Sequence, residues 1–205
     1  MLDASCGTRH HLARIAAELR SGVTGLGLDI SAAAARLAAR SSPNLAFVVA
    51  DLGSEWSVHD ALIDLVLNIF APRNFAETAR VLRPGGWLAL VYPEANHRIE
   101  LRRRYRLLDQ HGGKAERYHE AASRTIGPAA VTRIVRHATL APDAVRDLVL
   151  MGPNARHPPL TPLAAEAEPI AVTFDIAILF ARKRAGSPTK ESSRRSKGRW
   201  HFPAP

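Results

Sequence analysis

The chain is short of cysteine and of long apolar runs. Cys6 is the only cysteine among 205 residues, so neither an internal disulfide framework nor a four-cysteine zinc site can form within this sequence. A lone thiol suits a reducing compartment, and we expect a cytoplasmic protein. No apolar run reaches the roughly 20 residues that cross a bilayer, and the first residues lack a signal-peptide pattern. We therefore expect no membrane partner and no bound metal.

Acidic residues are also scarce, with 19 against 28 basic ones and a net charge of +9. The excess is concentrated in residues 184–205, which carry six basic side chains and one acid. This segment is rich in Ser and Pro and poor in aliphatic residues, so burial cannot offset the entropy lost on ordering. We predict a domain at 1–183 and a disordered basic tail at 184–205. The tail could contact RNA phosphates or simply aid solubility, and the sequence leaves both open.

Strand-like and helix-like patterns alternate along the rest of the chain. After a first strand at the N-terminus, strands are expected at 23–29, 45–50, 62–70, 87–92, 130–139 and 170–182, and helices at 11–20, 31–39, 74–82, 97–106 and 142–150. Residues 109–128 are polar and are expected to form a lid or substrate loop. The spacing predicts right-handed crossovers and an open parallel sheet. The late strands fit an antiparallel edge, which gives a Rossmann-like α/β fold with seven mostly parallel strands and helices on both faces.

Glycine is scarce in the turn that follows the first strand. Such a turn lets backbone approach a nucleotide-like cofactor closely, and a pattern Asp-x-Gly-x-Gly-x-Gly would place three glycines there. The chain has Asp3, Ser5, Gly7 and Arg9 at these positions, so only one glycine is present. Ser5 adds a small side chain and is expected to be tolerated. Arg9 requires either a different backbone angle or a side chain directed into solvent.

Three acidic residues close three successive strands: Asp3, Asp29 and Asp51. A single strand-ending Asp is more often a turn or helix-cap residue. In an open parallel sheet, however, the carboxyl ends of the strands meet at the edge where cofactors bind. Asp29 could accept both hydroxyl protons of a ribose, and Asp51 could accept from an adenine amino group. The ordered series therefore favours a nucleoside cofactor with a polar or positively charged amino-acid part.

Several segments together resemble a known family. They are LDASCG at 2–7, GLDIS at 27–31, ADLGS at 50–54, LNIFAPRNFAETARVLRPGG at 67–86, VLMGPNARH at 149–157 and VTFDIAILFARK at 172–183. The chain resembles the class I S-adenosylmethionine-dependent methyltransferases that modify a guanine N1 atom in 23S ribosomal RNA, a group that includes macrolide and tylosin resistance enzymes. The resemblance spans residues 1 to about 183, and its most specific part is the Phe-Ala-Pro stretch at 70–72.

The resemblance implies S-adenosylmethionine as cofactor and a ribosomal RNA hairpin as partner. The cofactor-binding residues would be Asp3, Ser5, Gly7, Asp29, Ile30, Asp51, Leu52 and Asn68. Members of the family carry an N-terminal zinc module that grips the RNA. This chain begins after the point where that module would end, so we expect no zinc site in it.

The resemblance places the target base near residues 68–72, which follow the predicted central strand. Asn68 and the neighbouring carbonyls are expected to orient the base edge, and Pro72 completes this candidate catalytic segment. Phe70 could pack beside the cofactor or the base, or be an ordinary core aromatic. Guanine N1 carries a proton that some group or water must accept, and no residue stands out as a general base.

An RNA hairpin would be read through an unpaired or flipped base, with its phosphates held by basic side chains. On a helix over 97–106, Arg98, Arg102 and Arg106 form a basic stripe, and Arg73 and Arg156 could join them. A charged helix face is more commonly a solvated surface, and both interpretations stay open. The histidines at 111, 119 and 137 lack metal-like spacing and are expected on the surface.

We therefore expect a methyltransferase that acts on a guanine N1 in 23S ribosomal RNA. Two alternatives remain open at the level of sequence. One is a noncatalytic RNA-binding or partner protein that kept the fold and lost the cofactor. The other is a methyltransferase of small molecules.

Overall fold

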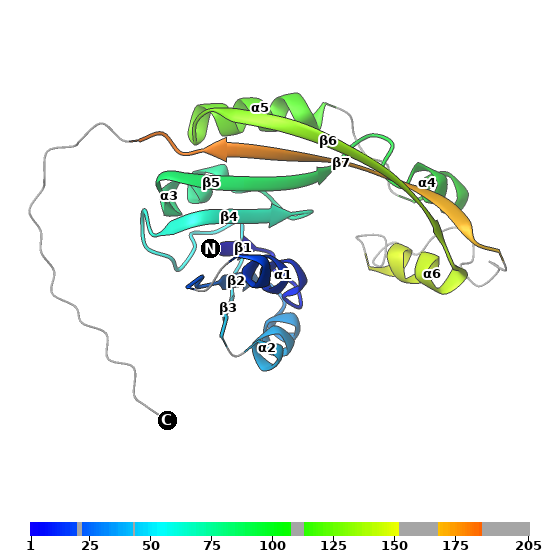
Figure 1. The fold of residues 1–205 in the computed structure, drawn as a ribbon, viewed down its shortest axis with the longest axis horizontal. Helices are drawn as coiled ribbons and strands as arrows, with labels where there is room; N and C mark the ends of the chain where they lie inside the picture. The colour runs from blue at the N-terminus through cyan, green and yellow to red at the C-terminus, as the bar shows by residue number, and fades with distance from the viewer. Residues whose placement is uncertain (20–21, 43, 108–112, 152–167, 186–205) are drawn as a thin grey trace, which may run out of the picture.

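A single seven-stranded sheet organises the molecule in the computed structural model, which describes residues 1–19, 22–42, 44–107, 113–151 and 168–185 (Figure 1). The strands are β1 (Leu2–Ala4), β2 (Leu26–Asp29), β3 (Ala46–Val49), β4 (Ile63–Ile69), β5 (Leu82–Pro93), β6 (Ala129–Leu140) and β7 (Ile170–Arg182). The helices are α1 (His10–Glu18), α2 (Ala32–Ser41), α3 (Phe75–Val81), α4 (Ile99–Tyr105), α5 (Lys114–Thr125) and α6 (Pro142–Leu150).

The strand order is β3-β2-β1-β4-β5-β7-β6. Strands β1 to β5 pair in parallel, whereas β7 runs antiparallel to both β5 and β6. The expected Rossmann-like sheet with an antiparallel edge is confirmed. The order reverses beside β1, because β2 and β3 extend the sheet on one side of it and β4 and β5 on the other.

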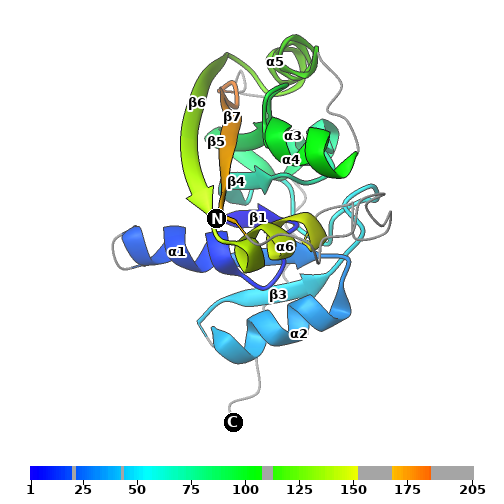
Figure 2. The same cartoon turned by 90° about the vertical axis from the view of Figure 1, so that its right-hand side faces the viewer.

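Helices cover both faces of the sheet (Figure 2). The figure shows α1 on one side and α3 and α5 on the other. Right-handed crossovers produce this arrangement, because a crossover that moves in the opposite direction along the sheet places its helix on the opposite face. The main core includes Leu2 of β1, Val66 of β4 and Leu90 of β5, all fully buried. The apolar run predicted as a central strand is β4, which lies between β1 and β5.

A smaller apolar cluster lies at one end of the sheet. It joins α4, α6 and β7 through Leu101, Tyr105, Val145, Val149 and Val172. Here α4 and α6 form where the sequence predicts helices. The local signal for α2 is also clear, because the Ser31 hydroxyl accepts from the Ala34 amide at 3.2 Å and caps the helix.

The structure corrects the prediction of a lid or loop at 109–128. Within that range, Lys114–Thr125 forms α5, whose Tyr118 and Ala122 are buried against the main core. These two positions are four residues apart and so share one helix face. The charged residues around them, among them Glu116, Arg117 and Glu120, mask this pattern in the sequence. Strand β2 is also shorter than expected, since it begins at Leu26 and not at residue 23.

Arg80 of α3 makes several contacts with the segment before β4 and with its own helix. Its guanidinium donates to Glu77, to Asp60, and to the carbonyls of Val58 and Trp56. Arg80 therefore ties the segment before β4 to α3. The predicted tail is described only through Ala185, and residues 186–205 lie outside the described part of the chain, as does Arg156.

Candidate functional site

The candidate site lies where the strand order reverses. Ala4 of β1 pairs with Leu28 of β2 on one side and with Asn68 of β4 on the other. The carboxyl ends of these three strands therefore lie side by side. Ligands of open α/β sheets bind in the crevice outside such ends. We call this edge of the sheet the rim.

The turn after β1 has the backbone of a glycine-rich loop although two glycines are missing. Ser5, Gly7 and Arg9 have φ of 76°, 53° and 82°, all in the left-handed region. The amides of Ser5 and Cys6 both donate to the Leu28 carbonyl, at 2.8 and 2.9 Å, and hold the turn against β2. Arg9 thus keeps the glycine-like angle that the sequence puts in question. The left-handed region disfavours side chains, so Ser5 and Arg9 carry local strain.

Asp29 connects β2 to this turn. Its two carboxylate oxygens accept from the amides of Gly7 and Ser31, each at 2.8 Å, and the residue is buried. A carboxylate offers about four lone-pair sites, so each oxygen retains one for a ligand hydroxyl. At Gly7 no atom lies within 4 Å of the position a Cβ would take. Open space therefore lies beside Gly7, the residue whose amide binds the Asp29 carboxylate.

Asp3 lies beneath the turn and is 1% exposed. Burial, and to a lesser degree the charge of Asp29, raise its pKa to about 7, while the Leu12 amide at the start of α1 opposes both effects. One oxygen, Oδ2, is buried without a hydrogen-bond partner. A positively charged or N–H-bearing group placed beside it would satisfy this oxygen and favour the ionised form. The environment of Asp3 thus fits the ammonium of an amino-acid group.

Ile30, Asp51 and Leu52 occupy the outer part of the rim. The Ile30 side chain is 72% exposed directly after Asp29, where it can pack against a flat ring. Asp51 is exposed and accepts from the Gly53 amide at 2.9 Å, as in a turn. Leu52 is buried, and its carbonyl accepts from the Asn74 amide group at 3.1 Å.

Asn68, Phe70 and Pro72 lie together after β4. The Asn68 side-chain amide donates to the Pro72 carbonyl at 2.7 Å, which leaves Asn68 Oδ1 buried without a partner. Phe70 has φ of 52° and is 52% exposed, so it is a rim side chain and not a core aromatic. This segment offers a flat apolar surface beside one unsatisfied acceptor.

The predicted basic stripe is only partly available to a ligand. The Arg98 guanidinium donates to the Leu148 carbonyl at 3.1 Å, and Arg102 donates to the Ala95 carbonyl. Arg106 is exposed after the end of α4. Arg73 stacks on the Tyr118 ring of α5, with its guanidinium carbon 4.5 Å from the ring centre. The sequence reasoning missed that Arg103 and Arg104 are the exposed basic residues within α4 itself.

Sequence reasoning also missed His97, which follows β5 and is 6% exposed. Its ring lies 5.7 Å from that of Phe70 and 5.9 Å from that of Phe174, measured between centres. Burial, and to a lesser degree the charge of Arg98, lower the pKa of His97 to about 4. Its position just after a strand that ends at the rim was the available signal, but the following run of arginines obscured it.

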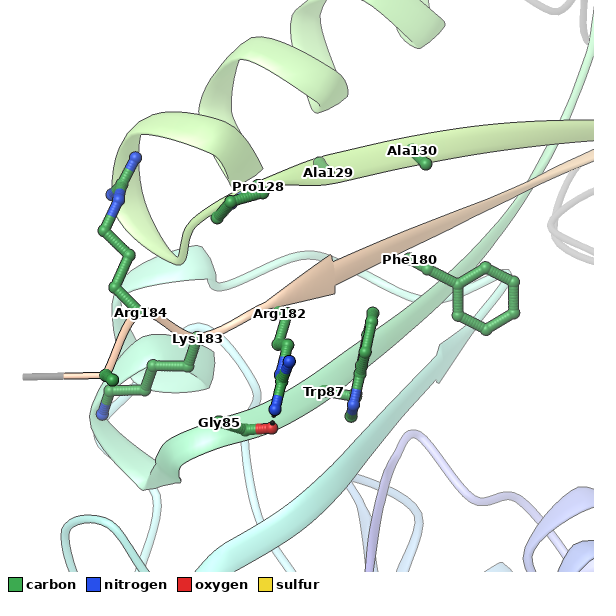
Figure 3. Close-up of a pocket in the computed structure, with 10 residues that line it drawn as sticks. Gly85, Trp87, Pro128, Ala129, Ala130, Phe180, Arg182, Lys183 and Arg184 are labelled. Carbon is green, nitrogen blue, oxygen red and sulfur yellow. Dashed lines mark hydrogen bonds between the residues drawn. The ribbon is translucent and has the colours of Figure 1, made fainter.

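A hollow lies away from the rim, beside the amino-terminal part of β5 (Figure 3). It has a volume of about 810 Å³, and Trp87, Phe180 and Arg182 are among the residues that line it. Trp87 and Phe180 are 44% and 42% exposed, and the Arg182 guanidinium lies over the Trp87 ring.

Within the described residues, no group of three or more His, Cys, Asp or Glu could hold a metal, and no helix could span a membrane.

Comparison with known proteins identifies relatives over most of this chain. Residues 1–86 match a family model described as a methyltransferase domain. A Micromonospora griseorubida protein whose name gives 23S rRNA (guanine-N1) methylation is 38% identical over 188 residues, covering 90% of this chain and 63% of that protein. The 23S rRNA (guanine(748)-N(1))-methyltransferase of Streptomyces fradiae is 37% identical over 157 residues, covering 77% of this chain and 56% of the relative.

Solved structures agree on the fold. A SAM-dependent methyltransferase from Methanosarcina mazei superposes with a TM-score of 0.56 at 17% identity, covering 90% of this chain and 92% of that one. The chain spans roughly three fifths of the length of the two curated relatives above. The matched domain, the sheet order and these relatives together show that the chain belongs to the class I methyltransferases and is a homologue of proteins named as 23S rRNA (guanine-N1)-methyltransferases.

Proposed function

We propose that the protein transfers a methyl group from S-adenosylmethionine to the N1 atom of a guanine in 23S ribosomal RNA, with release of S-adenosylhomocysteine and transfer of the N1 proton to water. The observation that carries this proposal is the likeness to relatives named for that reaction, at 37–38% identity over most of this chain. The match to a methyltransferase domain at residues 1–86 includes the segments that build the rim. A reaction on ribosomal RNA also fits a cytoplasmic protein.

The rim residues fit the parts of the cofactor. Asp29 would bind the ribose hydroxyls with its remaining lone pairs, and Ile30 would pack against the adenine, whose amino group Asp51 would bind. Asp3 would bind the amino group of the methionine part, beside the turn formed by Ser5 and Gly7. Burial and the unsatisfied Oδ2 of Asp3 support this last assignment. Leu52 and Asn68 would complete the cofactor site.

When bound, S-adenosylmethionine supplies a methyl group already activated on sulfur. The protein's main task is then to hold the target nitrogen in line with that methyl, and such positioning can lower a barrier by several kcal/mol. Asn68 would orient the base edge through its unsatisfied Oδ1, and the Pro72 carbonyl fixes that amide. Phe70 would lie against the face of the base and exclude water from the reacting atoms.

The RNA itself would be held by basic side chains around α4. Arg106 and the exposed Arg103 and Arg104 are placed for phosphate contacts, and Arg73, Arg98, Arg102 and Arg156 belong to the same proposed substrate set. Arg98 and Arg102 already donate to carbonyls, so we propose that they shape this surface more than they bind phosphate.

The decisive experiment combines cofactor binding with methyl transfer. Calorimetry with S-adenosylmethionine and S-adenosylhomocysteine measures the first. For the second, transcribed 23S RNA hairpins are incubated with protein and cofactor, then copied by reverse transcriptase. A methyl group on N1 occupies the pairing edge of guanine, so primer extension should stop at the modified base. A hairpin with adenine at that position is the matched control.

The outcomes separate the proposed function from its alternatives. Cofactor binding together with a guanine-dependent stop supports the proposal. RNA binding without measurable cofactor binding would leave a noncatalytic RNA-binding protein. Cofactor binding with methyl transfer only to small nucleophiles, and never to the hairpins, would place the protein among small-molecule methyltransferases.

A further inference from the structure

His97 is a buried histidine at the rim with an incompletely satisfied ring. The backbone of Asp175 lies near the ring and raises its pKa. The ring nitrogen Nδ1 is buried and has no hydrogen-bond partner. At neutral pH the ring is uncharged, because burial and the nearby charges of Arg98 and Arg102 outweigh the opposing effect of Asp175 on its pKa. In the tautomer that carries its proton on Nε2, Nδ1 is a hydrogen-bond acceptor without a partner.

A second unsatisfied acceptor lies on the neighbouring strand. Asn68 Oδ1 is buried without a partner on β4, two residues before Phe70, and the Phe70 ring lies next to His97. A buried polar atom left without a partner costs roughly 1–3 kcal/mol. A buried acceptor without a partner beside an exposed aromatic ring, as His97 Nδ1 is beside Phe70, indicates a ligand that brings an N–H donor. The Phe70 ring is already half exposed. Rotation of this ring away from His97 would therefore expose little additional apolar surface.

The pairing edge of guanine carries such donors, namely N1–H and the exocyclic amino group. A methyl group on N1 must take the in-plane position of the N1 proton, so an acceptor fixed at that position would block it. The amino group beside N1 keeps its hydrogens throughout the transfer and can be held from binding to product. Adenine has no amino group there and presents an acceptor at N1.

We propose that His97 Nδ1 accepts a hydrogen bond from the exocyclic amino group of the target guanine, and thereby selects guanine over other bases. The proposal rests on the proposed function, since it names the group that reads the base at the same site. The Phe70 ring moves aside to admit the base and then lies against its face. Asn68 and His97 approach the base edge from two different strand ends.

The test replaces the target guanosine by inosine, which differs only in lacking the exocyclic amino group. The value of kcat/KM is measured for both hairpins with the wild type and with His97→Phe. This variant keeps a ring between Phe70 and Phe174 but has no hydrogen-bond acceptor. Loss of one hydrogen bond to a buried acceptor predicts that the wild type favours guanosine about 10- to 100-fold. His97→Phe should reduce this preference to within about threefold.

The comparison of two substrates separates recognition from structural damage, because a general loss of activity affects both hairpins equally. His119→Phe, at an exposed histidine on α5, is the matched control and should keep the wild-type preference. If His97→Phe does not fold, His97→Leu serves in its place. An unchanged preference in a folded, active His97 variant overturns the assignment of His97 alone. A wild type that methylates neither hairpin overturns the proposed function, and the assignment with it.

Discussion

Asp3 shows how one buried carboxyl can link cofactor binding to pH. Burial raises its pKa to about 7, so the cation-binding ionised form is depleted in acid. In the absence of ligand the folded state holds this proton more tightly than the unfolded chain does. The contribution of Asp3 to stability is therefore fully present below about pH 4 and is lost as the pH rises through about 7.

From this we expect S-adenosylmethionine to bind more tightly as the pH rises toward about 8. Below a pKa of about 7, the dissociation constant should rise up to about tenfold per pH unit, because binding must first remove a proton. Calorimetry across this range measures the slope. Asp3→Asn should bind weakly at every pH and, without cofactor, unfold at a higher denaturant concentration than the wild type near pH 8. A wild-type affinity that does not change with pH would mean that Asp3 does not bind the charged group of the cofactor.

The left-handed angles of Ser5 and Arg9 give a second prediction. Replacing either residue by Gly should stabilise the fold by about 1 kcal/mol, since relief of the strained backbone exceeds the entropy that glycine adds to the unfolded chain. Urea unfolding measures the change. Thr8→Gly is the control, because Thr8 lies between them without a positive φ and should lose roughly 0.5–1 kcal/mol. Equal effects at positions 5, 8 and 9 would contradict this account of the turn.

At the scale of elements, ion pairing at α3 fixes the approach to β4. Glu77 Oε2 accepts from the Trp56 amide at 2.7 Å and from Arg80 at 2.6 Å. Arg80 holds the pKa of Glu77 below its usual range through this contact. Helix α3 is only 7 residues long. Its place against β5 therefore depends on these contacts as well as on the burial of Thr78 and Val81.

We expect Arg80→Met to destabilise the protein by about 2–3 kcal/mol. The substitution keeps apolar bulk but leaves the half-buried Glu77 carboxylate and two backbone carbonyls without their donor. Arg83→Met is the matched control, because Arg83 pairs with Asp64 at an exposed site and should cost at most about 1 kcal/mol. Chemical denaturation of both variants gives the comparison. A loss at position 80 no larger than at position 83 would mean that the Arg80 contacts contribute no more than an exposed ion pair.

For the molecule as a whole, cofactor binding should stabilise every part of the sheet at once. The rim draws residues from β1, β2 and β4, which lie at the centre of the strand order. A ligand present at about 100 times its dissociation constant adds about 2.7 kcal/mol to the free energy of unfolding, or roughly 5–10 °C in Tm for a domain of this size. Asp29→Ala should weaken cofactor binding by about 1–3 kcal/mol and shrink this shift accordingly. If cofactor raises the Tm of Asp29→Ala as much as that of the wild type, the ribose binds elsewhere.

Local sequence patterns predict much of this architecture. The strand and helix boundaries from 129 onward agree closely with expectation, because Pro142 and the long β-branched runs are strong signals. Helix α5 was missed because only its packing against Phe75 and Arg73 reveals which residues face inward. At the rim, the carboxylates could be predicted from their places at strand ends. His97 and the partners of Arg98 could not, because they depend on contacts between segments far apart in the sequence.

The direction of the strands decides where the two described ends of the chain emerge. Strands β1 to β5 run toward the rim, whereas β7 runs away from it and pairs its Arg182 with Trp87 near the start of β5 (Figure 1). Met1 lies just ahead of β1, where its amino group donates to the Thr24 carbonyl at 2.7 Å. Met1 and Ala185 therefore both face the side opposite the rim. A purification handle, dye or surface anchor attached at Met1 would leave the rim, where we propose that RNA binds, open to a large partner.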